Sequence, residues 1–287
     1  MKILITGADG QLGRCLQDCL GSSTHHWLAL NRSGLDITDS GAVAAAVSQF
    51  KPDVIINAAA YTAVDKAESD RDRAWAINAQ AVEHLAAAAN ATDALLIHVS
   101  TDYVFDGSAK TPYSETASLS PLGVYGSSKL DGETAAAKAQ RHCIVRTAWV
   151  FSEYGNNFLK TMLRVGADRD ELKVVADQVG TPTYAGDLAS ALLSMAEKGV
   201  PTGTYHFSGG EACSWWDFAN AIFECARETG TLEKSPALTP ITTQEYPTPA
   251  KRPQYSVLDN SKLNKALGAH TADWRSAVRK VLNELSV

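Results

Sequence analysis

Short apolar runs alternate with longer helical patterns along the first half of the chain. The apolar runs predict buried strands at 2–6, 27–30, 54–57, 95–99 and 143–146. Patterns with helical periodicity fall between them, at 11–20, 40–50, 72–90 and 122–140. Strands that are apolar throughout and alternate with helices are typical of a parallel sheet that is covered on both faces. We therefore predict an α/β fold with a Rossmann-type, doubly wound parallel sheet.

The pattern changes after about residue 149. Further elements are predicted as one strand at 172–175, helices at 156–165, 187–197 and 215–228, and a C-terminal helix from about Ala272. The segment 235–253 carries five prolines, which favour neither a helix nor a central strand. We predict a long loop there.

The two patterns together predict two domains. A dinucleotide-binding domain is expected at 1–147, together with about 184–215 and 254–271. A smaller, discontinuous α/β substrate-binding domain is expected at 148–183, 216–253 and 272–287. Doubly wound sheets bind ligands at the carboxyl ends of their strands, so we expect the substrate in the cleft between the domains.

Composition and charge exclude several classes of protein. The 287 residues are 45% hydrophobic and 20% charged, a balance that excludes a largely disordered chain. Acidic residues outnumber basic ones by 32 to 26, and the formal net charge is −6. A general nucleic-acid binder usually carries a basic face, so we expect no nucleic-acid partner. No run approaches the roughly 20 apolar residues that span a bilayer, so we expect no membrane partner.

The N-terminal pattern and the cysteines indicate a reducing compartment. The apolar run after Lys2 ends at Gly7 and is too short for a signal peptide. An odd, scattered set of five cysteines fits reduced thiols better than a disulfide framework (Cys15, Cys19, Cys143, Cys213 and Cys225). Cys15 and Cys19 face one side of a predicted helix, with no histidine or second cysteine pair at metal-ligand spacing. We expect a cytoplasmic protein without a metal site.

Three glycines follow the first predicted strand. Gly7, Gly10 and Gly13 form a G-x-x-G-x-x-G sequence that leads into the helix predicted at 11–20. Glycine permits a tight turn and a close approach of the backbone to a pyrophosphate, and the helix N-terminus attracts the anion. Three glycines also fit an ordinary strand–helix turn, but their position at the start of a doubly wound pattern favours dinucleotide binding.

The end of the second predicted strand bears on the choice of cofactor. NAD sites of this fold often carry an acidic residue here that holds the adenosine ribose. This chain has Asn31 and Arg32, and the arginine either meets the 2′-phosphate of NADPH or is a solvated surface charge. Asp36 and Ile37, at the end of a predicted third strand, are placed to contact the adenine, and small residues such as Ala58 leave room for a cofactor. We predict NADPH, with NADH as the alternative.

A tyrosine and a lysine are spaced for proton transfer. Tyr125 and Lys129 lie four residues apart, on one face of a predicted helix. The free phenol has a pKa near 10, and a neighbouring lysine cation is expected to lower the pKa of Tyr125. Ser100 or Thr101, after the strand at 95–99, can donate a hydrogen bond to a substrate carbonyl. Each pattern alone also fits a surface pair or a turn, and the glycine turn upstream favours catalysis.

Longer segments give the chain a specific resemblance. They are ILITGADGQLG, LDITD, NAAAYTAVDKAE, STDYVFDG at 100–107, YGSSK, RTAWVF, GNNF, QVGTPT and the KRP before Tyr255. From end to end, the chain resembles the dTDP-4-dehydrorhamnose reductase family of the extended short-chain dehydrogenases. NAAAYTAVDKAE and STDYVFDG are far more specific than the glycine turn or the Tyr–Lys pair.

The resemblance implies a reaction and a set of site residues. NADPH or NADH would reduce the C4 ketone of dTDP-4-dehydro-6-deoxy-L-mannose to dTDP-L-rhamnose. Tyr125 would donate the proton, Lys129 would tune Tyr125 and hold the ribose, and Thr101 would polarise the carbonyl. The implied cofactor contacts are Gly7, Gly10, Gln11, Leu12, Gly13, Asn31, Arg32, Asp36, Ile37, Ala58, Ala60, Tyr61, Thr62, Val99, Tyr125 and Lys129. The implied substrate contacts are Val64, Thr101, Asp102, Phe105, Trp149 and Arg252.

Several alternatives stay open at this stage. Trp149 also fits core packing, and Arg252 also fits a solvated loop charge. Another nucleotide-sugar reductase or epimerase of the same superfamily would share the glycine turn and the Tyr–Lys pair. A non-catalytic regulatory subunit is a different class of protein, and the presence of Thr101, Tyr125 and Lys129 together argues against it. An NADPH-sensing module is a third alternative, which would bind the cofactor without turning over a substrate.

The chain departs from some relatives at the first predicted helix. Those relatives hold magnesium between subunits through acidic side chains, one of them on this helix. Here the sequence reads Arg14-Cys15-Leu16-Gln17, with no acid before Asp18. We therefore expect neither this metal nor the dimer built around it, and a homodimer of another kind stays open.

Overall fold

The fold is organised around a six-stranded parallel sheet. The computed structural model describes residues 1–268 and 273–285. The strands follow the order β10-β5-β4-β3-β1-β2, and each pairs in parallel with its neighbours. Their bounds are β1 (Lys2–Thr6), β2 (His26–Leu30), β3 (Val54–Asn57), β4 (Leu95–Thr101), β5 (His142–Thr147) and β10 (Gly203–His206). Chain order reverses between β1 and β3, so their carboxyl ends border the crevice in which such sheets bind ligands.

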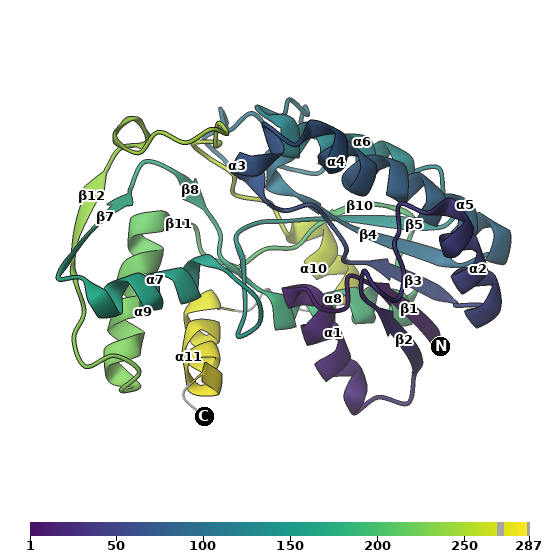
Figure 1. Cartoon of the computed structure of the whole chain (residues 1–287), viewed down its shortest axis with the longest axis horizontal. Coiled ribbons are helices and arrows are strands. Elements are labelled where there is room, and N and C mark those ends of the chain that lie inside the picture. The colour runs from purple at the N-terminus through teal and green to yellow at the C-terminus, as the bar shows by residue number, and fades with distance from the viewer. Residues whose placement is uncertain (269–272, 286–287) are drawn as a thin grey trace.

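Helices cover both faces of this sheet (Figure 1). Along β1, Ile3 and Ile5 pack into one buried cluster and Leu4 into the other, because side chains alternate across a strand. The first cluster takes in α1 (Gln11–Gly21), α8 (Ala185–Lys198) and α10 (Ser261–Leu267), and the second takes in α2 (Ser40–Phe50), α5 (Ala81–Thr92) and α6 (Val124–Ala136). The predicted doubly wound α/β fold is confirmed. Within the described ranges, no helix is both long and apolar enough to cross a membrane.

A second group of elements lies beside the sheet, at the left of Figure 1. Helices α7 (Phe158–Asp168), α9 (Trp215–Glu228) and α11 (Trp274–Leu285) pack around a core that includes Phe151, Phe218 and Trp274. Three short strand pairs accompany them, namely β6 (Val150–Phe151) with β9 (Thr183–Tyr184), β7 (Glu171–Val175) with β12 (Ala237–Ile241), and β8 (Val179–Gly180) with β11 (Cys213–Ser214). The two-domain division stays a prediction, and its boundary at 271–272, with the helix start at Ala272, falls outside the described residues.

Two predictions in the first half of the chain are wrong. The single helix predicted at 72–90 consists of α4 (Arg71–Trp75), a π-helical turn η1 (Ala76–Gln80) and α5. The third strand predicted to end at Asp36 and Ile37 is absent, because these residues lie in the turns between β2 and α2. A π turn shifts the side chains that follow it around the helix axis, and this one sets the position of Asn78 beside the candidate site.

The loop predicted at 235–253 is partly a strand. β12 contains Pro240 and pairs with β7 alone, so the missing N–H of the proline costs no hydrogen bond to a second neighbour. A 3₁₀ turn, η3 (Thr243–Glu245), follows, and the rest of the segment to Pro253 has no regular structure. β10 and α10, which were not predicted, extend the edge and one face of the central sheet.

Candidate active site

The glycine turn joins β1 to α1 at the carboxyl edge of the sheet. Gly7 has φ +74°, and a Cβ at this position would lie 2.6 Å from the Ala59 backbone nitrogen. A Cβ on Gly13 would lie 2.2 Å from the Gly7 carbonyl oxygen, so Gly13 permits close packing of α1 on the turn. Gly10 gives α1 no side-chain cap, and the first turn of the helix carries no acidic residue. The first N–H groups of α1 are therefore available to an anion.

A cavity of about 440 Å³ opens beside this turn. Ten of the predicted cofactor residues line it, namely Gly7, Gly10, Asn31, Arg32, Asp36, Ile37, Ala58, Ala60, Tyr61 and Thr62. The remaining lining residues were not predicted, namely Asp9, Leu35, Thr38, Ala59, Ala63, Arg73 and Ile77. The cavity and the helix N-terminus together fit a dinucleotide that extends across the ends of β1 and β3.

Two guanidinium groups border the cavity. Arg32, whose side chain is 70% exposed, lies 3.9 Å from Asp36, whose pKa is lowered chiefly by hydrogen bonds from Thr38. Arg73 lies over the ring of Tyr61, at 5.9 Å from its centroid. Two arginines where NAD-specific sites often place an acid fit a phosphate-bearing adenosine. Arg73 was missed because it lies about 40 residues from Arg32 in the sequence.

Asn78 connects the cavity wall to the catalytic helix. Its side chain accepts a hydrogen bond from the Tyr61 N–H at 2.8 Å and donates to the Tyr61 carbonyl at 3.1 Å. It also donates to the Ser128 hydroxyl on α6 at 3.0 Å. Asn78 is fully buried, so these bonds hold the segment around Tyr61 against α6. An asparagine inside an Ala-rich helical pattern was the available sequence signal.

The structure brings Tyr125 to the end of β4. A Cβ on Gly126 would lie 2.2 Å from the Tyr103 carbonyl oxygen, so the glycine lets the start of α6 approach the turn η2 (Asp102–Val104). The ring of Tyr125 packs edge-to-face on Tyr103, with centroids 5.5 Å apart. Burial raises the pKa of Tyr125 to about 12, although the Thr101 hydroxyl lowers it. The expected lowering of the Tyr125 pKa is therefore wrong, and the phenol stays protonated at neutral pH.

Lys129 is buried one helical turn beyond Tyr125. Its ammonium nitrogen lies 2.7 Å from the Val99 carbonyl oxygen, which accepts a hydrogen bond from it, and 3.3 Å from His98 Nε2. Burial lowers the pKa of Lys129 to about 8, and Glu133 opposes this shift. The amine of Lys129 thus titrates close to neutral pH, as proton-handling groups in active sites often do.

Asp102 is a buried carboxyl group next to Thr101. One carboxylate oxygen accepts a hydrogen bond from the Thr101 hydroxyl at 3.0 Å, and the other, Oδ2, makes no hydrogen bond of normal geometry within the described residues, although Ser256 lies close enough to lower the pKa of the carboxyl group. Burial raises the pKa of Asp102 to about 6. A buried acceptor without a partner fits a group that awaits a ligand hydroxyl.

Substitution of Asp102 by Asn should stabilise the protein at alkaline pH. The folded-state pKa is raised, so the carboxyl group favours folding only when protonated, and this contribution is lost as pH rises through about 6. At pH 8 we expect a gain of about 3 kcal/mol in the free energy of unfolding, and little gain at pH 4. Urea unfolding at the two pH values measures this difference. Asp106→Asn is the control, because the Asp106 pKa is lowered and its loss should not stabilise the fold at pH 8.

Comparisons with known proteins agree with this geometry. A family model described as the RmlD substrate binding domain matches residues 1–287. The chain belongs to this family. A dTDP-4-dehydrorhamnose reductase of Aggregatibacter actinomycetemcomitans is 48% identical over 98% of each chain. The crystal structure of a dTDP-4-dehydrorhamnose reductase from Clostridium acetobutylicum matches with a TM-score of 0.94 at 44% identity over 100% of each chain. That of the Bacillus anthracis reductase in complex with NADP matches with a TM-score of 0.92 at 37% identity over 99% of each chain.

In this RmlD-family chain, the predicted substrate residues differ in whether they have a surface that a ligand could contact. Val64 begins α3 (Val64–Ala67), and Arg252 makes a two-pronged ion pair with the adjacent Asp65, at 2.8 and 3.1 Å. Trp149, at φ +49°, stacks on Trp215 with centroids 3.5 Å apart and is only partly buried. Phe105 differs, because it is fully buried and stacked on Tyr113. The structure therefore places Phe105 in the core, with no surface for a ligand.

Three residues expected at the cofactor have a side chain or a backbone carbonyl that is occupied by the protein. The Gln11 amide accepts hydrogen bonds from Ser152 and Asn157, and donates to the Val150 carbonyl oxygen. Leu12 is buried in the core beneath the sheet, and the Val99 carbonyl accepts the bond from Lys129. Only the backbone N–H groups of Gln11 and Leu12 are therefore candidates for cofactor contact.

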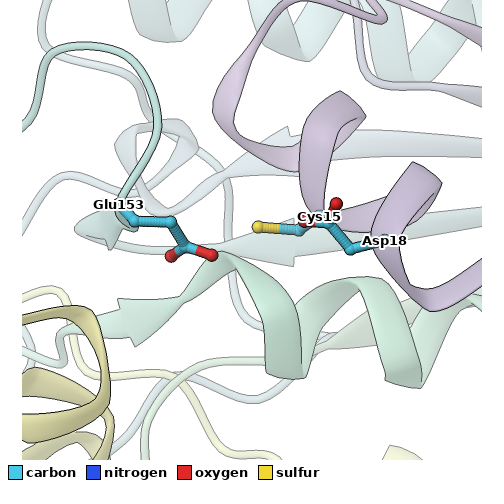
Figure 2. A group of neighbouring side chains, drawn as sticks. All are labelled: Cys15, Asp18 and Glu153. Atoms are coloured by element: carbon cyan, nitrogen blue, oxygen red, sulfur yellow. The ribbon is translucent and has the colours of Figure 1, made fainter. Parts of the chain in front are cut away.

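A cluster of three potential metal ligands lies between α1 and the segment after β6. Figure 2 shows Cys15 and Asp18 on α1 facing Glu153, and their ligand atoms lie within 4.8 Å of one another. Burial raises the pKa of the Cys15 thiol well above its usual value. Mg²⁺ prefers oxygen ligands in octahedral geometry, and a protonated, buried thiol does not supply one. This donor set does not fit magnesium.

Proposed function

We propose that this protein is an NADPH-dependent reductase that converts dTDP-4-dehydro-6-deoxy-L-mannose to dTDP-L-rhamnose, the last step of dTDP-rhamnose synthesis. The observation that carries the proposal is the placement of Thr101, Tyr125 and Lys129 around the carboxyl end of β4, at the same edge of the parallel sheet as the cavity beside the glycine turn. Full-length relatives at 48% and 44% identity, named as reductases of this substrate, support it.

Different residues of the chain have separate roles in the proposed reaction. NADPH, when bound, supplies the hydride, and the glycine turn with Arg32 and Arg73 would hold its phosphates. Tyr125 keeps its proton at neutral pH and can give it to the ketone oxygen as negative charge develops there. The Thr101 hydroxyl, which donates to Asp102 here, would have to turn toward that oxygen to act as a second hydrogen-bond donor, where it would stabilise the transition state more than the ground state. Asp102 would accept a sugar hydroxyl through its unpartnered Oδ2.

The alternative functions make different use of the same cavity. A regulatory subunit or an NADPH sensor needs the cavity and does not need Thr101, Tyr125 and Lys129 gathered at the end of β4. An epimerase of the same superfamily shares these residues and retains its cofactor, whereas a reductase must exchange it at every turnover. Release of NADP after one turnover therefore separates a reductase from an epimerase.

The test is a coupled assay with the sugar nucleotide made in place by the upstream enzymes. The purified protein and NADPH are added, and nicotinamide absorbance and the sugar product are followed together. We expect NADPH oxidation that depends on the sugar nucleotide and yields dTDP-rhamnose over many turnovers. NADPH binding without oxidation would overturn the proposal and favour a sensor or a regulatory subunit.

Substitution of Arg32 by Ala should weaken the binding of NADPH selectively. Loss of a charge-assisted hydrogen bond costs about 1.5–3 kcal/mol, which raises the Kd for NADPH by about 10- to 100-fold. The Kd for NADH should stay within a few-fold, because NADH lacks the 2′-phosphate. Fluorescence titration of the two cofactors measures both values. Arg141→Ala removes the same charge outside the cavity and serves as control, and equal loss of both cofactors in Arg32→Ala would contradict the prediction.

We extend the proposal to domain organisation and location. The dinucleotide-binding part is placed at 1–147, 184–215 and from 254, and the packing of α8 and α10 against the central sheet supports this assignment. The substrate-binding part is placed at 148–183, 216–253 and the C-terminal helix, and the aromatic core around Phe218 supports it. The cytoplasm is the proposed location, in keeping with five cysteines that are all free thiols in the described structure.

A further inference from the structure

His98 is a fully buried histidine that the proposed mechanism does not use. It lies in the middle of β4, between Asn57 on β3 and Lys129 on α6. Its Nδ1 is 3.0 Å from the Asn57 amide nitrogen, and its Nε2 is 3.3 Å from the Lys129 amine. Thr6, Asn57, His98 and Lys129 thus form one continuous hydrogen-bonded chain inside the sheet.

The orientation of the Asn57 amide is determined by its neighbours. The backbone N–H of Ala59 can only donate, and it lies 3.2 Å from Asn57 Oδ1. Oδ1 also accepts from the Thr6 hydroxyl at 2.6 Å. The amide NH₂ of Asn57 must therefore be the group that faces His98, because a flipped amide would turn a donor onto the Ala59 N–H.

This orientation determines which nitrogen of His98 carries hydrogen. Because the Asn57 NH₂ donates to Nδ1, Nδ1 must be the unprotonated nitrogen of the ring. A neutral His98 then carries its hydrogen on Nε2, and that N–H points at the Lys129 nitrogen. An ammonium group at Lys129 has no lone pair, so it could not accept a hydrogen bond from this N–H. A neutral amine can accept that bond and still donate to the Val99 carbonyl.

We propose that His98 is a positioning residue that, through the tautomer set by Asn57, favours the neutral amine of Lys129 over the ammonium in the free enzyme. This inference rests on the proposed reductase function. A neutral amine leaves Tyr125 protonated, which is the state that ketone reduction requires, whereas an ammonium would favour the phenolate. His98 would thereby set the free enzyme for reduction rather than for alcohol oxidation.

Other charged and titratable groups also lie around Lys129. Glu133 lies one turn further along α6 and favours the ammonium form, but its carboxylate is paired with Arg146 from β5 at 2.7 Å. Tyr125 lies one turn before Lys129, and Thr6 and Asn57 on the neighbouring strands are uncharged. Burial lowers the pKa of His98 well below its usual value, which agrees with a neutral ring.

The first test reads the tautomer directly. Nitrogen-15 NMR of histidine-labelled enzyme distinguishes a protonated from an unprotonated ring nitrogen, and the spectrum of His98→Gln identifies the His98 signals among those of the seven histidines. In the wild type we expect hydrogen on Nε2 alone. Hydrogen on Nδ1, or an imidazolium ring, would overturn the proposal, and neither result depends on whether the protein turns over the sugar nucleotide.

The second test reverses the tautomer. In Asn57→Asp, a carboxylate can only accept, so His98 should carry hydrogen on Nδ1, and Nε2 should accept from a Lys129 ammonium. The ammonium should lower the pKa of Tyr125, so the alkaline limb of the kcat/KM profile for NADPH, which reports the free enzyme, should shift to lower pH by about 1–3 units. Thr6→Val is the matched control, because the Ala59 N–H still orients Asn57 and neither readout should move.

The results of the two tests together separate the role of His98 from the proposed function. A reversed tautomer with an unchanged alkaline limb would overturn the role of His98 at Lys129. If Asn57→Asp does not fold, the wild-type and Thr6→Val spectra decide the tautomer by themselves. If neither enzyme reduces the sugar nucleotide while the spectra are as expected, the proposed function fails and the hydrogen-bonded arrangement stands.

Discussion

Replacement of Tyr125 by Phe should lower kcat for ketone reduction by about 10²- to 10⁴-fold and leave the fold intact. The change removes only the hydroxyl that carries the proton. The phenylalanine ring can still pack edge-to-face on Tyr103, so the fold should be retained. Burial keeps this hydroxyl protonated, so the wild type begins each reduction with the proton in place. The loss is measured as steady-state kcat with NADPH and the 4-dehydro sugar nucleotide.

Tyr103→Phe is the matched control for this prediction. Tyr103 is the other member of this ring pair, and Tyr103→Phe removes the same hydroxyl group as Tyr125→Phe. We expect this variant to keep kcat within a few-fold of the wild type. A Tyr125→Phe enzyme that retains more than a tenth of wild-type activity would show that another group supplies the proton, and Thr101 would be the first to test.

The sheet could be predicted from the sequence because its strands are short, continuous apolar runs. Residues 3–6, 54–57 and 143–146 are all buried, as the apolar runs predict for strands that are covered on both faces. The failures occur where tertiary contacts outweigh local pattern. The π turn around Asn78 depends on contacts with Tyr61 and Ser128, which no local periodicity contains.

The positions of the candidate catalytic residues could be predicted from the sequence, but their pKa shifts could not. The spacing of Tyr125 and Lys129 indicated a shared helix face, and the structure places both residues on α6. The spacing could not indicate that the Lys129 amine faces Val99 and His98, because these two residues lie on β4 and not on the helix. The direction of the Tyr125 pKa shift was wrong for the same reason, since burial depends on the whole fold. A histidine inside the apolar run at 95–99 was the one signal that could have indicated the His98 contact.

Close to this site, a buried ion pair ties the catalytic helix to the sheet. Arg146 on β5 makes two hydrogen bonds to Glu133 on α6, at 2.9 and 2.7 Å, and both side chains are more than 90% buried. Ser100, next to Thr101, donates to the same carboxylate. The pair therefore connects α6, which carries Tyr125, to the end of β4.

Replacement of Arg146 by Met should lower the free energy of unfolding by about 3–5 kcal/mol, because it leaves the Glu133 carboxylate buried without its counter-charge. Urea unfolding followed by circular dichroism measures the loss. The double variant Arg146→Met with Glu133→Leu should recover most of it, since removal of both charges also removes the cost of keeping one of them out of water. A double variant as unstable as the single one would contradict this account. In that case, the hydrogen bond from Ser100 to Glu133, and not the pairing of opposite charges, would be the interaction that stabilises the fold.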